Sequence, residues 1–135
     1  MRTLPFFSLL LITFSLAGLE KLFGFQVPTW FLDQFHNSLL DIVPGMLEVS
    51  FGLITFLELT TSALLLIGIA KREFLQSSAT QQIFLKYGVL LAQITFVALG
   101  FGQRLTHKYE AAATLFFYAI LTFIASHIAL ARDEK

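Results

Sequence analysis

A single acidic residue, Glu58, interrupts a long apolar stretch of the sequence. It is the only charged residue between Glu48 and Lys71. A carboxyl group at the centre of a bilayer costs about 2.5–3.5 kcal/mol on insertion scales, so it normally faces a bundle interior, a water-filled cavity or a partner. Such a group could exchange a proton or hold a ligand. The alternative is a neutral, protonated carboxyl that is hydrogen-bonded to Thr55 or to a neighbouring helix.

Polar residues around Glu58 recur at helical spacing. Glu48, Thr55 and Ser62 are seven residues apart, and Glu58 stands three after Thr55 and four before Ser62. This spacing predicts one polar stripe along a helix. A second stripe, expected to face the first, recurs every four residues near the C-terminus: Thr114, Tyr118, Thr122 and Ser126. Hydroxyls of this kind also serve simply as packing contacts worth about 0.6–2 kcal/mol each.

Further charges gather near the predicted outer boundary of the membrane. Glu20 and Lys21 end the first apolar run and are expected at a depth similar to that of Glu48. A Lys21–Glu48 ion pair is therefore geometrically possible. The last loop adds charged and titratable residues on the same side, which predicts an outer polar pocket: Arg104, His107, Lys108 and Glu110. The alternative is that these side chains extend independently to the headgroups.

Composition assigns the chain to the integral membrane proteins. Hydrophobic residues make up 56% of it, charged residues only 13%, and Phe occurs 16 times; both fractions depart from those of soluble domains. The 135 residues allow one small domain. The chain has no cysteine, so it can form no disulfide and carry out no thiol chemistry of its own. A redox role would need a partner or a bound cofactor, and the zero net charge implies no nucleic-acid partner.

Four apolar runs are long enough to cross about 30 Å of hydrocarbon. They cover about residues 4–25, 45–70, 83–102 and 111–131, and residues 76–82 form a polar connector. The prediction is an all-α fold, an integral membrane four-helix bundle that goes up and down in a single domain, residues 1–135.

The distribution of lysine and arginine predicts the orientation. Six lie in the N-terminus, the loop at 71–86 and the C-terminal tail: Arg2, Lys71, Arg72, Lys86, Arg132 and Lys135. Three lie on the other side: Lys21, Arg104 and Lys108. Cytoplasmic loops carry the excess of positive charge, so both termini are expected in the cytoplasm.

The connector at 28–45 contains apolar residues at helical spacing, namely Phe31, Leu32, Phe35, Leu39, Ile42 and Val43. This pattern predicts a short amphipathic helix with Thr29 as its N-cap and Trp30 at the headgroup boundary, closed by Pro44 and Gly45. Such a helix would lie on the outer surface as an anchor, or dip into it as a lid.

Two segments resemble the DoxX-like family of small membrane proteins. The run from Ser15 to Phe23 resembles that family's Gly-x-x-Lys-Leu/Phe pattern, and Leu57-Glu58-Leu59 followed by residues 63–68 and a basic pair is similar to its Glu…Leu-Leu-Gly…Arg segment. The resemblance implies a four-helix protein of a bacterial inner membrane. Some members act beside a catalytic partner in quinol oxidation, thiosulfate oxidation or thiol-oxidant defence. Lys21 and Glu58 are the residues that carry over, whereas Glu20 has no counterpart in the pattern.

The leading hypothesis is an accessory subunit of a membrane complex, such as a respiratory or redox assembly, without autonomous catalysis. Its partners would be membrane lipids and other membrane subunits, and a polar intramembrane pocket would hold a quinone or lipid. The candidate pocket residues are Glu58, Glu48, Lys21, Glu20, Thr55, Ser62, Tyr118, Thr122 and Arg104.

Two alternative functions belong to other classes of membrane protein. The first is a small proton-coupled transporter similar to small multidrug-resistance proteins, although those carry their key Glu in the first helix rather than the second. The second is a membrane enzyme acting on a lipidic substrate, with Glu58 or Glu48 as acid or base. No metal-binding motif such as HExxH or a His pair is present, and His127 is only a weak haem or metal candidate.

Overall fold

A computed structural model describes residues 3–24 and 26–130. Its four long helices are α1 (Leu4–Phe23), α3 (Met46–Ala70), α4 (Ile83–Leu105) and α5 (Tyr109–Ala129). The short elements are α2 (Thr29–Phe35) and the 3₁₀ turns η1 (Glu73–Leu75) and η2 (Ala79–Gln81), and the described residues contain no strand. Each long helix is long and apolar enough to cross a membrane. The all-α membrane bundle is confirmed, and the predicted ends at residues 25 and 131 lie outside the described residues.

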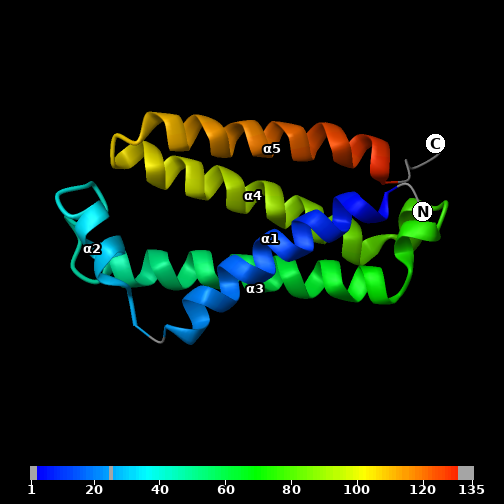
Figure 1. The fold of residues 1–135 in the computed structure, drawn as a ribbon, viewed down its shortest axis with the longest axis horizontal. Helices are drawn as coiled ribbons and strands as arrows, with labels where there is room; N and C mark the ends of the chain where they lie inside the picture. Colours follow the sequence, from blue (N-terminus) through cyan, green and yellow to red (C-terminus); the bar gives the residue numbers. More distant parts are fainter. Residues whose placement is uncertain (1–2, 25, 131–135) are drawn as a thin grey trace.

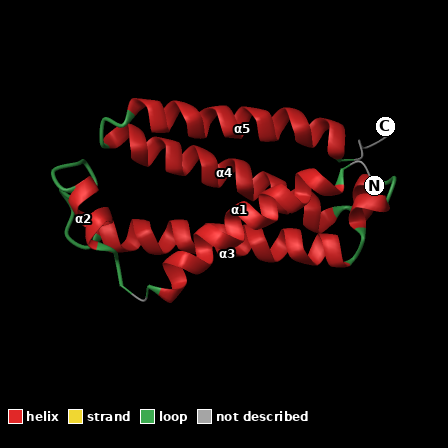
Figure 2. Cartoon of the chain, viewed as in Figure 1, coloured by secondary structure: helices red, strands yellow, loops and turns green. Residues whose placement is uncertain are grey.

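The long helices run alternately up and down (Figures 1 and 2). Helix α5 packs along α4, α4 packs along α3, and α1 crosses α3 obliquely. The start of α1, the end of α5 and the α3–α4 connector lie at one end, called here the terminal end. Helix α2 and the α4–α5 connector lie at the opposite end, the α2 end. Helices α3 and α4 diverge towards the α2 end, which leaves space between them for α2 and its neighbours.

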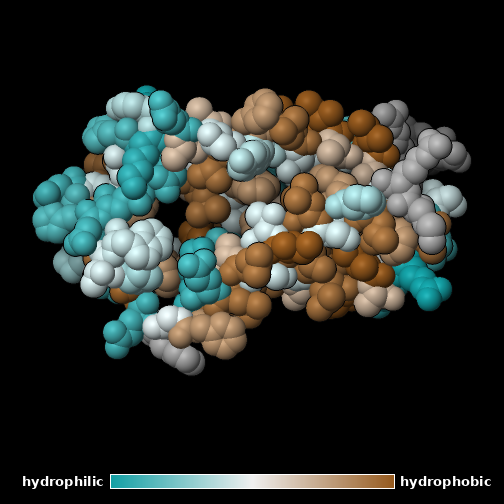
Figure 3. All heavy atoms as spheres, viewed as in Figure 1, coloured by the Kyte–Doolittle hydropathy of each residue, from teal (hydrophilic) through white to brown (hydrophobic). Residues whose placement is uncertain are grey.

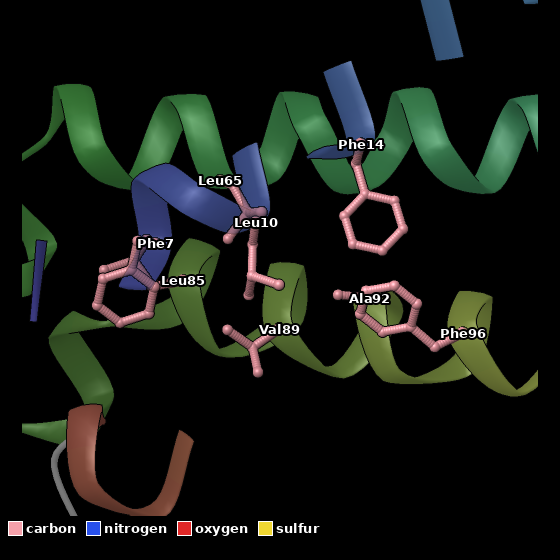
Figure 4. Close-up of a cluster of buried hydrophobic side chains, with 8 residues drawn as sticks. All are labelled: Phe7, Leu10, Phe14, Leu65, Leu85, Val89, Ala92 and Phe96. Carbon is pink, nitrogen blue, oxygen red and sulfur yellow. The ribbon is translucent and has the colours of Figure 1, made fainter. Parts of the chain in front are cut away.

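The apolar core lies where α1, α3 and α4 meet (Figure 4). Its buried residues are Phe7, Leu10, Phe14, Leu65, Leu85, Val89, Ala92 and Phe96. Three partly buried residues of α5, together with Leu130 at its C-cap, also pack against this cluster: Leu115, Ala119 and Ala129. The core therefore joins all four spans.

Two glycines bring α3 and α4 into close contact. A Cβ on Gly68 would lie 2.7 Å from Leu85 Cδ2, and a Cβ on Gly88 would lie 2.9 Å from Leu65 Cδ2. Each helix thus presents a Leu-x-x-Gly segment, and each leucine fills the space that the other helix's glycine leaves open. Small residues at such positions allow membrane helices to approach closely.

Large apolar side chains cover the outside of the bundle. They include Leu16 on α1, Phe56 on α3, Val97 on α4 and Phe117 on α5, all at least half exposed. Figure 3 shows hydrophobic residues across the middle and the right of the visible face and hydrophilic residues gathered at the α2 end. An apolar girdle of this kind matches a hydrocarbon environment.

The predicted amphipathic helix is shorter than expected. Helix α2 ends at Phe35, and Asn37 adopts the left-handed conformation (φ 63°) while its backbone N–H donates to the Asp41 carboxylate. Asn tolerates this conformation because its short polar side chain does not clash as larger ones do. Thr29 is the first helical residue, and Pro28, not Thr29, occupies the N-cap position. The three apolar residues expected to continue the helix are exposed instead: Leu39, Ile42 and Val43.

The polar connector between α3 and α4 is more ordered than its composition suggested. Glu73 is buried, and its carboxylate accepts a hydrogen bond from the backbone N–H of Leu85, in the first turn of α4, at 2.9 Å. The side-chain amide of Gln82 donates to the carbonyls of Glu73 and Gln76 at 3.0 and 2.9 Å. A carboxylate at a helix N-terminus satisfies a free N–H and interacts favourably with the helix dipole.

Candidate intramembrane binding site

Lys21 and Glu58 form an ion pair inside the bundle. The Lys21 ammonium lies 2.9 and 2.8 Å from the two carboxylate oxygens of Glu58 and donates to both. It also donates, at 3.3 Å, to the carbonyl of Ala17 one turn earlier. Glu58 is 1% exposed, and the Lys21 side chain is 19% exposed. The carboxylate that looked isolated in the sequence therefore has a cationic partner on another helix.

A glycine positions this pair. A Cβ on Gly18 would lie 2.8 Å from Leu59 Cδ2 and 3.3 Å from the Leu59 backbone nitrogen, so only glycine permits this contact between α1 and α3 without displacement. Lys21 follows Gly18 by three residues and lies on the same face of α1. Because Glu58 directly precedes Leu59, the close approach of α1 and α3 brings the Lys21 ammonium into contact with the Glu58 carboxylate.

The predicted Lys21–Glu48 pair is wrong, because Lys21 binds Glu58 instead. From the sequence, the end of α1 was expected at the same depth as the start of α3. The oblique crossing of α1 instead brings Lys21 to the middle of α3, ten residues or about 15 Å beyond Glu48. Glu48 and Glu20 are both exposed.

The hydroxyls next to Glu58 donate hydrogen bonds to backbone carbonyls of their own helix, α3. Thr55 donates to the carbonyl of Phe51 at 2.8 Å, and Ser62 donates to the backbone carbonyl of Glu58 at 3.0 Å. The carboxylate oxygens accept from Lys21, not from Thr55. The expected Thr55–Glu58 hydrogen bond is therefore replaced by the contact with α1.

The second hydroxyl stripe does not face the first. Helix α4 lies between α5 and α3. The buried residues Thr122 and Ser126 therefore belong to a helix that packs along α4 and not along α3, which carries Glu58. Tyr118 is exposed at 46%, and its ring packs on Phe96 with centroids 5.9 Å apart. The order of packing places α4 between the helix of Tyr118 and Thr122 and the helix of Glu58.

Arg104 also lies apart from the ion pair. Its guanidinium stacks over the Tyr109 ring at 4.3 Å from the centroid, at the exposed α4–α5 connector. His107, at φ 61°, contacts the Tyr109 hydroxyl through Nδ1 at 3.0 Å. The outer charges thus form local contacts at the bundle end instead of lining one mixed pocket with Lys21.

A cavity of about 300 Å³ lies at the α2 end, where α3 and α4 diverge. Figure 3 shows the surface hollowed between the hydrophilic α2 end and the hydrophobic middle. The polar residues that line the cavity are Lys21, Ser50 and Gln103. The remaining lining is apolar and strongly aromatic: Trp30, Phe31, Phe35, Leu40, Phe51, Leu53, Ile54, Ala98, Leu99, Phe101 and Gly102. The volume is at the lower end of the range for small-molecule pockets.

Lys21 also borders a second, shallower hollow of about 420 Å³ on its other side. Glu48 and Thr55 line this hollow together with Gln26 and Gly52. The structure therefore brings Lys21 together with Glu58 by direct contact and with Glu48 and Thr55 by a shared hollow. Glu58 itself lines neither space, and the same holds for the other predicted site residues Glu20, Ser62, Tyr118, Thr122 and Arg104.

Gln34 fastens α2 over the cavity of about 300 Å³. Its amide nitrogen donates to Gln103 Oε1 at 3.2 Å and to Thr106 Oγ1 at 3.4 Å, and its amide oxygen accepts from the Lys108 ammonium at 2.9 Å. These contacts, called here the Gln34 latch, tie α2 to the end of α4. Neither Gln34 nor Gln103 was predicted from the sequence as a site residue, and the aromatic lining was not predicted either. The one available signal was the concentration of Trp and Phe before and within α2.

No protein-family model, curated protein or solved structure matches this chain.

Proposed function

We propose that this protein binds a quinone or a lipid in the cavity at the α2 end and acts as an accessory subunit of a membrane complex. The observation that carries the proposal is the cavity itself, which combines an aromatic, apolar lining with one ammonium group in its wall. A quinone ring or an acyl chain suits the apolar lining, because burial of apolar surface stabilises the complex by about 25 cal/mol per Å².

The polar lining residues supply the groups that would orient such a ligand. Lys21, Ser50 and Gln103 can all donate hydrogen bonds to a carbonyl or phosphate oxygen. The Lys21 contact with the Ala17 carbonyl, at 3.3 Å, is the longest of its hydrogen bonds and is the one that a ligand oxygen would replace. Glu58 would then hold the ammonium in place during the exchange.

The subunit role and the bacterial inner membrane rest on the resemblance to DoxX-like proteins. The two positions that carry over from that pattern, Lys21 and Glu58, are the two that meet in the ion pair. The apolar outer surface of the spans offers ample area for neighbouring helices.

The proposed orientation places the terminal end in the cytoplasm. In the described residues, Lys71, Arg72 and Lys86 lie towards that end, against Arg104 and Lys108 towards the α2 end. Lys21 is occupied inside the bundle by Glu58. The other three residues of the sequence argument, Arg2, Arg132 and Lys135, lie outside the described residues. The excess of lysine and arginine at the terminal end among the described residues supports the same orientation as the count over the whole sequence.

The ion pair also weighs against a proton-coupled transporter. Such a protein needs a carboxylate that alternates between a proton and its substrate, whereas Lys21 contacts both oxygens of Glu58. If Glu58→Gln abolished proton-coupled uptake or efflux in vesicles, the transporter would replace the binding subunit as the preferred function.

A cavity-filling variant tests the proposal. The tagged protein would be purified in nanodiscs from native membranes, and its extractable quinones, lipids and co-purifying proteins would be identified by mass spectrometry. Ser50→Leu places a larger side chain at the cavity wall without removing a member of the ion pair. Ala113→Leu, on the exposed face of α5, is the matched control.

We expect a specific quinone or lipid in the wild type and in Ala113→Leu and its loss in Ser50→Leu, with a stoichiometric partner protein in all three. A wild-type protein that retains no specific molecule would contradict the binding proposal. A protein that retains its ligand but is isolated without any partner would contradict the subunit role.

A further inference from the structure

Helix α4 carries an amide without a partner at the middle of the membrane span. Gln93 lies ten residues after Ile83 and twelve before Leu105, and its side chain is partly exposed on the outside of the bundle. Within the described part of the chain it has no hydrogen-bond partner. An amide that faces hydrocarbon without a partner is unfavourable, because lipid tails can neither donate nor accept.

Gln93 lies in a groove on the outer face of α4. The groove has a volume of about 500 Å³ and is lined by Leu90, Gln93, Ile94, Val97, Ala98 and Phe101. The exposed apolar residues of this face follow one another at alternating intervals of four and three: Ile83, Tyr87, Leu90, Ile94, Val97 and Phe101. An apolar seam with this 3.5-residue period is the pattern by which two helices pack along each other.

We propose that a second copy of this chain occupies the groove, so that the protein is a homodimer with α4 against α4. Two copies inserted with the same orientation are related by a two-fold axis along the membrane normal, and the same residue then lies at the same depth in both. Gln93 of each copy meets Gln93 of the other. A primary amide has both donors and an acceptor, so it is complementary to itself.

A second copy fits this position better than lipid or an unrelated helix. Lipid would leave the amide unsatisfied, and another protein would have to present a polar group at the same depth. Ala98 and Phe101 line both the groove and the cavity at the α2 end. The second copy would therefore also support one wall of that cavity, although the dimer does not depend on what the cavity binds.

Cysteine cross-linking in native membranes tests the dimer, since the chain has no cysteine of its own. Leu90→Cys and Val97→Cys flank Gln93 on the seam, and Ile120→Cys is the control at mid-span on the exposed face of α5. We expect oxidation to link two copies at Leu90→Cys and Val97→Cys and not at Ile120→Cys. Equal cross-linking at all three positions, or none at the α4 positions, would overturn the proposal.

Removal of the amide tests the role of Gln93 itself. In the Val97→Cys background, Gln93→Leu should weaken association by about threefold to thirtyfold, the range for polar contacts between membrane helices. Ile94→Leu, an apolar exchange on the same face, should leave cross-linking close to that of Val97→Cys alone. An unchanged dimer fraction in Gln93→Leu, or cross-linking to a different protein in place of a second copy, would refute the assigned contact.

Discussion

The two ends of the bundle hold α3 and α4 in different ways. Towards the terminal end, Leu65 and Leu85 each fill the space beside a glycine of the other helix, and the contact is apolar and fully buried. At the α2 end the same two helices diverge around a cavity, and hydrogen bonds from Gln34 close it. The protein thus places its tightest packing and its open space on one pair of helices.

Loss of one member of the ion pair should have the largest effect on stability. In Glu58→Leu the Lys21 ammonium remains inside the bundle without its carboxylate, and removal of one partner from a buried pair typically costs about 3–5 kcal/mol. The double variant Lys21→Met/Glu58→Leu should recover most of this loss, because it leaves no unpaired charge. The free energy of unfolding in bicelles, measured by steric trapping, would compare the two variants. A double variant no more stable than Glu58→Leu would contradict the interpretation.

An added methyl group at the terminal end should have the next largest effect. In Gly68→Ala the new Cβ lies 2.7 Å from the Leu85 side chain and 3.1 Å from its backbone nitrogen, so α3 and α4 must separate. We expect a loss of about 1–3 kcal/mol in the free energy of unfolding. Gly52→Ala, on the same helix with open space around it, is the matched control and should be neutral or stabilising by up to about 1 kcal/mol. Equal stability of the two variants would mean that the contact tolerates a wider spacing.

The Glu73 carboxylate that caps α4 should contribute less to stability than the ion pair or the glycine contact. Glu73→Ala removes the acceptor of the Leu85 N–H and should cost about 0.5–2 kcal/mol. Glu73→Gln keeps an oxygen at this position and should retain more of the stability. Thermal unfolding of both variants in the same detergent would rank them. A Gln variant less stable than the Ala variant would argue against capping as the role of this side chain.

The Gln34 latch should affect stability least and ligand exchange most. Gln34→Ala removes three partly exposed hydrogen bonds, and we expect a stability loss below about 1 kcal/mol. If the protein binds the proposed quinone or lipid, its release should accelerate, because α2 is no longer fastened to α4. Thr29→Ala, an exposed change on the same short helix, is the control for release rates measured by ligand transfer to acceptor nanodiscs. Identical release from both variants would show that α2 does not limit exchange.

The sequence predicted the spans well and the site only in part. Runs without charge mark hydrocarbon-spanning helices directly, so α1, α3, α4 and α5 begin and end within a few residues of their predicted bounds. Lys21 and Glu58 were both identified as candidates, but not as partners. Their pairing depends on the angle at which α1 crosses α3, and a pattern of residue types along one helix carries no information on that angle.

Other differences between the sequence predictions and the structure have similar causes. The apolar spacing at 31–43 predicted a longer helix, because periodicity does not reveal that Asn37 turns to a positive φ and that Asp41 binds its N–H. The two hydroxyl stripes were expected to meet, because a linear sequence does not state which helices are neighbours. The burial of Glu73 was not predicted, since it depends on the contact of this side chain with the first turn of α4.

The paired Leu-x-x-Gly segments restrict how this protein can move. A leucine seated beside a glycine on each helix blocks sliding of α3 along α4 in either direction, since a shift would drive the side chain against the neighbouring turn. The contact lies towards the terminal end and so acts as a pivot. Rotation about it displaces the far ends of α3 and α4 the most, where the cavity lies. Opening and closing of the cavity can thus occur as a scissor motion that leaves the helices and their core intact.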